Sequence, residues 1–157
     1  MEKRVLFVCL GNICRSPLAE ALFVKNAKAA GLADSVLADS CGTSNYHIGD
    51  PPDRRSYANA LANGVTIEHA GRQLQYQDLL DFDYIFAMDQ QNLRDISELS
   101  RGHPDEGRIM LMREFDSSVN GLADVPDPYY GGDNGFQEVY EILDRSTRNF
   151  VESIGTL

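Results

Sequence analysis

Short apolar runs alternate with amphipathic segments along the chain. The runs are rich in β-branched, aromatic and long aliphatic side chains, which is typical of buried strands. Four strands are predicted, at residues 4–8, 35–41, 83–88 and 108–112. Apolar side chains three and four positions apart predict four helices, at residues 16–30, 53–62, 89–99 and 136–153. Asp53 and Asp89 each begin a predicted helix and can cap it. Strands that alternate with helices predict an α/β fold: a three-layer, doubly wound, four-stranded parallel sheet with helices on both faces.

The chain is expected to form one domain. A chain of 157 residues, 43% of them hydrophobic, can build a single core of ordinary size, and it shows no internal repeat or linker, so residues 1–157 are predicted to be one unit. Residues 114–135 are polar and rich in Gly and Pro, and this stretch is longer than a simple connection requires. It is therefore a candidate functional loop. Asp78, Asp81 and Asp83 are expected to be solvated at the ends of helices and strands.

Acidic residues outnumber basic ones by 24 to 14, which gives a formal net charge of −10. Nucleic acids and anionic membranes bind basic surfaces, so neither is an expected partner. No stretch approaches the about 20 apolar residues needed to cross a bilayer, and no export signal is recognised. Three cysteines without an export signal fit the reducing cytoplasm better than a disulfide scaffold. No pattern such as Cys-x2-Cys indicates a metal, so neither a metal nor a cofactor is expected.

The candidate chemistry lies in residues 9–17, Cys-Leu-Gly-Asn-Ile-Cys-Arg-Ser-Pro, after the first strand and at the start of the first helix. In this order of elements, backbone N–H groups and the helix dipole converge on one point and favour a bound anion such as phosphate. We expect this phosphate-binding loop to hold Cys9 as a thiolate nucleophile and Arg15 as a two-pronged ligand for phosphate oxygens. Ser16 is placed to cap the helix or to hydrogen-bond the thiolate, and Asn12 to support the loop, because Asn tolerates left-handed backbone. The other loop residues predicted to contact the oxyanion are Leu10, Gly11, Ile13 and Cys14.

A thiolate that attacks a phosphoester needs an acid to protonate the departing oxygen. Asp127 is the preferred candidate, because the flanking Pro126 and Pro128 stiffen its segment and limit its other conformations. Asp-Pro is also a common turn dipeptide, and Asp124 is the alternative acid.

Tyrosines near these segments are candidate walls of a substrate slot. Tyr129 and Tyr130 follow the candidate acid, and Tyr46 lies on a turn-rich loop that leaves the same end of the sheet. Together they are predicted to form a slot for an aryl phosphate, too deep for a phosphoserine to reach Cys9. Exposed loop tyrosines are common, and for Tyr46 or His47 taken alone an ordinary exposed position is the simpler interpretation.

The remaining cysteines allow two interpretations. Cys14 lies five residues after Cys9, and in one interpretation the two thiols can close a reversible disulfide that protects Cys9 from irreversible oxidation. Alternatively, Cys14 packs as a small hydrophobic side chain. Cys41 is expected to be buried and unreactive.

The sequence VCLGNICRSP, together with Asp-Pro-Tyr beginning at Asp127, resembles the low-molecular-weight protein tyrosine phosphatases, also called acid phosphatases. The resemblance covers nearly the whole chain. It implies an enzyme that hydrolyses phosphotyrosine and small aryl phosphates without a metal, through a phosphocysteine intermediate on Cys9. Arg15 then binds the phosphate, and Asp127 acts first as general acid and then as general base.

The resemblance also implies that Ser40 and His69 support Asn12, a structural role and not a chemical one. The implied partners are phosphotyrosine-containing proteins, among them a bacterial tyrosine kinase, and inorganic phosphate or other oxyanions in the loop.

The same loop is also compatible with three other functions. An arsenate reductase needs further cysteines to relay a disulfide, and none follows Cys41. In a protein-arginine phosphatase of the resembled family a threonine is typical at the position of Ile13, so the bulky Ile13 favours tyrosine. A non-catalytic phosphopeptide-binding module is disfavoured because Cys9, Arg15 and Asp127 are all present.

Overall fold

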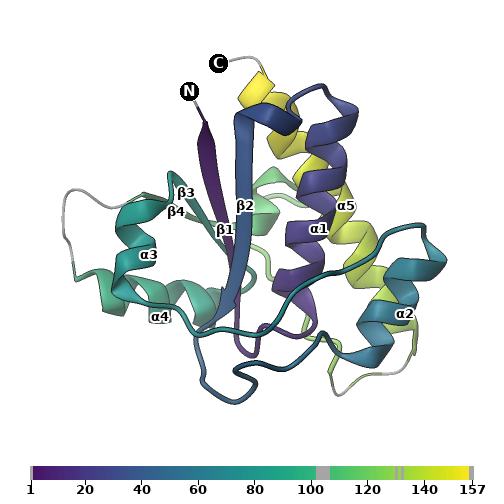
Figure 1. The fold of residues 1–157 in the computed structure, drawn as a ribbon, viewed down its shortest axis with the longest axis horizontal. Coiled ribbons are helices and arrows are strands. Elements are labelled where there is room, and N and C mark those ends of the chain that lie inside the picture. The colour runs from purple at the N-terminus through teal and green to yellow at the C-terminus, as the bar shows by residue number, and fades with distance from the viewer. Residues whose placement is uncertain (1, 102–106, 130, 132, 156–157) are drawn as a thin grey trace.

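A four-stranded sheet, with all neighbouring strands parallel, forms the centre of the molecule in the order β2-β1-β3-β4 (Figure 1). The computed structural model describes residues 2–101, 107–129, 131 and 133–155. The strands are β1 (Lys3–Cys9), β2 (Val36–Gly42), β3 (Tyr84–Ala87) and β4 (Arg108–Leu111). The helices are α1 (Arg15–Ala29), α2 (Arg54–Ala62), α3 (Tyr76–Asp81), α4 (Gln90–Ser100) and α5 (Asp133–Gly155), with 3-10 turns at Ala33–Ser35 and Met112–Phe115. The predicted parallel sheet is confirmed, and every strand end lies within one residue of its predicted position.

Helices cover both faces of the sheet, as predicted. Figure 1 shows α1, α2 and α5 on one side of the strands and α3 and α4 on the other. Side chains of β1 alternate between the two faces, so Val5 and Phe7 belong to one hydrophobic core and Leu6 and Val8 to a second. Burial on both sides explains why the central strands are continuous apolar runs. No helix in the described ranges is long and apolar enough to cross a bilayer.

The structure corrects the predicted elements at two places. α3 was not predicted, because a helix of six residues is too short to show a clear apolar period. Asp78, expected to be solvated, is buried: its two oxygens each accept a 3.0 Å hydrogen bond from Arg72, and it also accepts one from the Gln75 N–H at the start of α3. The ion pair offsets the unfavourable burial of the charge. α5 begins at Asp133, so the end of the predicted 114–135 loop belongs to a helix.

The strand order places the loop after β1 at a switch point. From β1 the chain first forms β2 on one side and later returns to form β3 on the other side. In doubly wound sheets, ligands bind outside the carboxyl ends of the strands where the order reverses in this way. The candidate phosphate-binding loop begins there, directly after Cys9.

Asp116 anchors the segment that leads to Asp127. Its buried carboxylate accepts hydrogen bonds from Arg113 at 2.9 Å, from Arg145 of α5 at 2.7 Å and from the Ser118 hydroxyl at 2.7 Å. Burial opposes the charge, but the hydrogen bonds from Arg145, Ser118 and Arg113 hold the pKa of Asp116 well below its ordinary value. The start of the acid-bearing segment is thus fixed to α5.

We predict that Asp116→Asn lowers the free energy of unfolding by about 2 kcal/mol at pH 7, because hydrogen bonds to a charged group are lost. A carboxylate with a depressed pKa stabilises the fold above the pKa of unfolded aspartate, about 3.9, and loses this effect as the pH falls through the folded value. The penalty should therefore shrink in acid. Urea unfolding at pH 7 and at a pH below about 3.9 measures the penalty, with the exposed Asp34→Asn as the control variant. Equal unfolding curves for Asp116→Asn and the wild type at pH 7 would contradict the prediction.

Candidate active site

The loop between β1 and α1 is held from outside through its carbonyl groups. The carbonyls of Cys9 and Leu10 accept hydrogen bonds from the N–H groups of Thr43 and Ser44, at 2.9 and 3.0 Å, directly after β2. Gly42 permits this approach, because a Cβ atom there would lie 2.7 Å from the Leu10 carbonyl oxygen. The end of β2 therefore fixes the first half of the loop.

The second half of the loop is held by the start of α2. The Asp53 N–H donates to the Ile13 carbonyl at 2.8 Å, and the Ser56 hydroxyl donates to the Cys14 carbonyl at 3.1 Å. Cys14 is the N-cap residue of α1, and its side chain makes no capping hydrogen bond. The first N–H groups of α1 thus remain for an anion.

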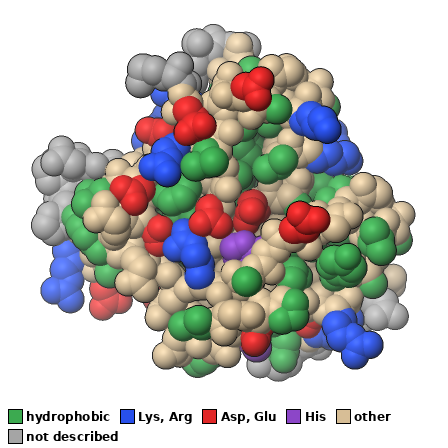
Figure 2. Space-filling model, viewed as in Figure 1, with side chains coloured by type: hydrophobic (Ala, Val, Ile, Leu, Met, Phe, Trp, Pro, Cys, Tyr) green, Lys and Arg blue, Asp and Glu red, His purple; other side chains and the backbone are tan. Residues whose placement is uncertain are grey.

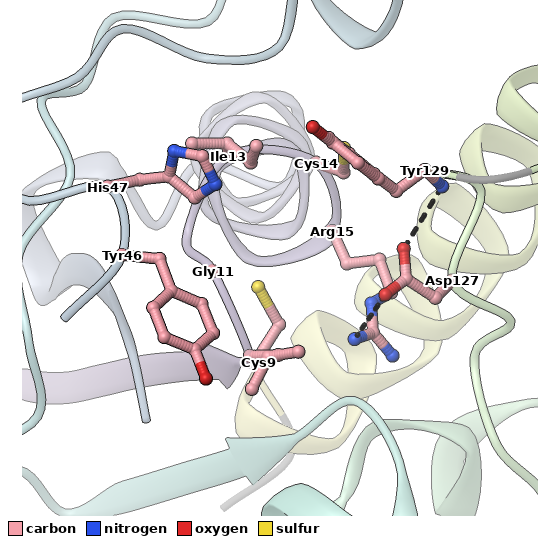
Figure 3. A pocket seen from close by; sticks show the side chains of 10 residues that line it. Cys9, Gly11, Ile13, Cys14, Arg15, Tyr46, His47, Asp127 and Tyr129 are labelled. Atoms are coloured by element: carbon pink, nitrogen blue, oxygen red, sulfur yellow. Dashed lines mark hydrogen bonds and ion pairs between the residues drawn. The ribbon is translucent and has the colours of Figure 1, made fainter. Parts of the chain in front are cut away.

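Cys9 lies at the floor of a cavity of about 280 Å³. The residue as a whole is 2% exposed, but Figure 3 shows its sulfur pointing into the cavity. Its Sγ is 3.0 Å from the Ser16 hydroxyl and 3.3 Å from the backbone nitrogen of Asn12, which donates to it. Either the thiol or the hydroxyl can be the donor in the contact with Ser16, whereas the Asn12 N–H can only donate to the sulfur.

Asn12 joins the loop to the sheet. It adopts the left-handed conformation expected of it, with φ of 59°. Its Nδ2 donates to the hydroxyls of Ser16 and Ser40, at 2.8 and 3.1 Å, and its Oδ1 accepts from the Arg72 N–H at 3.0 Å. His69 Nε2 lies 2.7 Å from the same oxygen and must donate, because a carbonyl oxygen only accepts. The structure thus brings Ser40 and His69 to Asn12, and places the Asn12 and Ser16 side chains behind the loop, outside the cavity lining.

Glu20 and Asp39 complete this polar network and were missed by the sequence analysis. Ser40 donates its hydroxyl to Glu20 at 2.7 Å and its N–H to Asp39 at 2.8 Å, and Glu20 lies 3.3 Å from His69 Nδ1. Burial raises the pKa of Glu20 to about 7 and lowers the pKa of His69, so it favours the uncharged form of both. Figure 2 shows acidic side chains close to a histidine on the face that carries β2. Ligand atoms of Glu20, Asp39 and His69 lie within 4.8 Å of one another, but the bonds from Ser40 already explain the grouping.

Arg15 is buried at the edge of the cavity, with 3% of its side chain exposed. Its Nη1 donates to Asp89 at 2.6 Å and to the Val125 carbonyl at 3.1 Å, and its Nη2 is 3.5 Å from Asp127. Burial opposes its charge, but Cys9 and Asp89 outweigh burial and raise the pKa of Arg15. Asp89, predicted only as a helix cap, does cap α4 through its other oxygen. One carboxylate therefore both starts a helix and orients the guanidinium.

Asp127 lines the cavity beside Arg15. Its side chain is 38% exposed, one oxygen faces Arg15, and the other accepts the Tyr129 N–H at 3.1 Å (Figure 3). Asp124, the alternative acid, accepts hydrogen bonds from the backbone and side chain of Gln90 and is not among the described residues that line the cavity. The geometry thus favours Asp127 over Asp124 as the group that meets a ligand.

Aromatic side chains flank the mouth of the cavity. Tyr46, which is 73% exposed, and Tyr129 lie on opposite sides of Cys9 (Figure 3). Tyr130 lies outside the described residues. His47 also lines the cavity, although the sequence alone did not distinguish it from an ordinary exposed residue. The predicted loop residues that line the cavity are Leu10, Gly11, Ile13 and Cys14.

The three cysteines are free thiols in different environments. Burial, followed by the charge of Asp53, raises the pKa of Cys14 to about 12. Burial also raises the pKa of the fully buried Cys41 well above its ordinary value. Both are therefore neutral at pH 7, and the two interpretations of Cys14 stay open.

Comparison with known proteins places these features in a family context. A family model described as "Low molecular weight phosphotyrosine protein phosphatase" matches residues 4–156. The protein of that name from Schizosaccharomyces pombe is 45% identical over 153 residues, covering 96% of this chain and 96% of that protein. Among solved structures, the chain is similar to the protein tyrosine phosphatase of Entamoeba histolytica with Hepes in the active site, with a TM-score of 0.91, 37% identity and coverage of 99% and 100% of the two chains. It is also similar to the Drosophila arginine phosphatase, with a TM-score of 0.87, 32% identity and coverage of 98% of both chains.

We predict that Asn12→Gly and Asn12→Ala both weaken the binding of inorganic phosphate by about tenfold or more, because buried partners of the amide lose their hydrogen bonds. Glycine keeps the left-handed backbone and removes only the amide, whereas alanine also strains the loop. Isothermal titration with phosphate measures the effect, and wild-type affinity in the glycine variant would contradict the role of the amide.

Iodoacetamide at pH 7 is predicted to alkylate Cys9 and to leave Cys14 and Cys41 unmodified, because the thiolate is the reactive form. Phosphate in the loop should slow the reaction. Peptide mass mapping identifies the labelled cysteine, and Cys9→Ser serves as the unlabelled control. Comparable labelling of Cys14 would show that the donors around Cys9 do not set it apart.

Proposed function

This chain belongs to the low molecular weight phosphotyrosine protein phosphatase family, and we propose that it hydrolyses phosphotyrosine in proteins, and small aryl phosphates, through a phosphocysteine on Cys9. One arrangement carries the proposal: the Cys9 sulfur lies at the floor of a cavity that Arg15 and Asp127 also line. A nucleophile, a ligand for phosphate oxygens and an acid thus face the same small space.

In the first step, the phosphate group enters the loop and its oxygens meet the loop N–H groups and the Arg15 guanidinium. The Cys9 thiolate attacks phosphorus, the S–P bond forms and the bond from phosphorus to the phenolic oxygen breaks. Asp127, as a carboxylic acid, gives its proton to that oxygen, and the phenol leaves. The Ser16 hydroxyl and the Asn12 N–H stabilise the thiolate before the attack.

In the second step, Asp127 is a carboxylate and takes a proton from water. The water oxygen attacks phosphorus, the S–P bond breaks, and phosphate leaves as the Cys9 thiolate is restored. Each proton and electron pair is accounted for by groups of the chain and by water, and the proposed reaction uses no metal.

The depth of the sulfur below the cavity mouth supports selection of aryl phosphates. Tyr46 and Tyr129 flank the entrance, and a flat ring between them can deliver phosphorus to the floor. Ile13, another lining residue, is apolar, which favours an aromatic ring over the polar guanidino group of phosphoarginine. The arsenate reductase alternative is disfavoured because Cys41 is fully buried and no cysteine follows it.

The natural substrate proposed here is a phosphotyrosine-containing protein of the cytoplasm. Free thiols fit a reducing compartment. If the source is a bacterium, a tyrosine kinase is the proposed partner, and trapping phosphoproteins from a lysate on the Cys9→Ser variant tests this choice.

Two variants test the reaction. Cys9→Ser is expected to abolish hydrolysis of phenyl phosphate and of a phosphotyrosine peptide, because the nucleophile is lost. Asp127→Asn is expected to lower kcat/KM for phenyl phosphate by about 10²- to 10⁴-fold, the usual contribution of a positioned acid. Steady-state release of phosphate measures both.

A chelator should leave the wild-type rate unchanged, and phosphoarginine should be hydrolysed more slowly than phosphotyrosine. Turnover by Cys9→Ser would exclude the phosphocysteine, and faster hydrolysis of phosphoarginine would replace the proposed substrate.

A further inference from the structure

Arg55, in the first turn of α2, reaches across to the segment that carries Asp127. Its Nη2 donates to the Tyr129 carbonyl at 2.9 Å. The centre of its guanidinium lies 5.4 Å from the Tyr129 ring and 4.8 Å from the ring of Phe136 in α5. One side chain thus contacts α2, the acid-bearing segment and α5, with cation–π contacts to two rings.

The guanidinium of Arg55 is itself held in one orientation. Asp53 Oδ1 accepts from Nε at 3.2 Å and Oδ2 accepts from Nη2 at 3.1 Å, which is a two-pronged pair. Asp53 Oδ1 also caps α2 by accepting the Arg55 N–H at 2.8 Å. Burial opposes the charge of Asp53, but these hydrogen bonds from Arg55 lower its pKa. The guanidinium is therefore fixed relative to α2, and one of its N–H groups is directed at the Tyr129 carbonyl.

The same turn of α2 is fixed to the nucleophile loop. The Asp53 N–H donates to the Ile13 carbonyl at 2.8 Å, and the buried Ser56 donates to the Cys14 carbonyl at 3.1 Å. Arg55 lies between these two residues in the sequence. Its position is thus set by the loop that holds the thiolate.

Tyr129, whose carbonyl accepts the hydrogen bond from Arg55, also contacts the proposed acid. The Tyr129 N–H donates to Asp127 Oδ1 at 3.1 Å. Two residues before the acid, the buried Val125 donates its N–H to the Met88 carbonyl at 2.8 Å and accepts from Arg15. The short segment from Val125 to Tyr129 is therefore held by hydrogen bonds at both ends. Arg55 donates the hydrogen bond at the Tyr129 end.

We propose that Arg55 is a positioning residue for the general acid: it fixes the Tyr129 backbone to the nucleophile loop and so sets the distance between Asp127 and the substrate above Cys9. The inference rests on the proposed acid role of Asp127. Lysine cannot replace Arg55, because a single ammonium cannot bond Asp53 with two prongs and reach the Tyr129 carbonyl at once.

The test compares two substrates that need the acid to different extents. Phenyl phosphate releases a weakly acidic phenol with a pKa of about 10, like tyrosine, and depends on protonation of the leaving oxygen. 4-Nitrophenyl phosphate releases a stable phenolate, so its hydrolysis depends little on protonation of the leaving oxygen. Arg55→Ala is expected to lower kcat/KM for phenyl phosphate by about tenfold to 100-fold, the effect of a misplaced catalytic group, and for 4-nitrophenyl phosphate by about threefold at most.

Matched variants separate positioning from folding. Arg54→Ala removes a neighbouring exposed arginine and should leave both values unchanged, whereas Arg55→Lys should behave like Arg55→Ala. In the Asp127→Asn background, Arg55→Ala should cause no further loss on phenyl phosphate, because its effect passes through the acid. Thermal melting of each variant shows that the fold is kept.

Equal losses on both substrates, or a further loss in the Asp127→Asn background, would overturn the inference and leave the proposed function intact. If Asp127→Asn itself affects both substrates equally, the acid assignment fails, and the positioning role of Arg55 fails with it. The two failures are thus distinguishable.

Discussion

A buried positive charge must be paired, and Arg15 shows how much of this structure depends on that requirement. Its guanidinium is held by Asp89, by the Val125 carbonyl and by Asp127, three groups that come from the end of β3 and from the segment before α5. These groups meet only because β3 lies beside β1 in the sheet. The parallel strand order is therefore a condition for the phosphate site as well as for the core.

The same requirement explains the network behind the loop. Asn12 offers its amide to buried hydroxyls and to His69, and in a low-dielectric interior each of these groups needs a partner. The network ends at Glu20 of α1, so the shape of the loop is tied to the helix that follows it. In a chain with a formal net charge of −10, an anion is attracted by this local order of donors, whereas the overall charge repels it.

The proposed acid is placed differently from the proposed nucleophile. Cys9 belongs to a strand end, whereas Asp127 lies in an irregular segment that gains its position from contacts at Asp116, Val125 and Tyr129. A loop fixed at several points can hold a partly exposed carboxylate near a buried sulfur without burying the carboxylate fully. Both side chains therefore line the same cavity, although only one of them belongs to a strand.

The sequence alone determined the four strands, most of the helices, the caps at Asp53 and Asp89 and the position of the candidate phosphate-binding loop after the first strand. These features are local, because the spacing of apolar residues, the helix caps and a loop of consecutive residues each depend on residues close together in the sequence. The sequence did not disclose that Asp89 orients Arg15, that Glu20 and His47 join the site, or that Arg55 holds Tyr129. Arg15 and Asp89 are separated by 74 positions, as are Arg55 and Tyr129. Only the tertiary structure decided these pairs, because strand order and the packing of helices on the sheet choose which distant side chains meet.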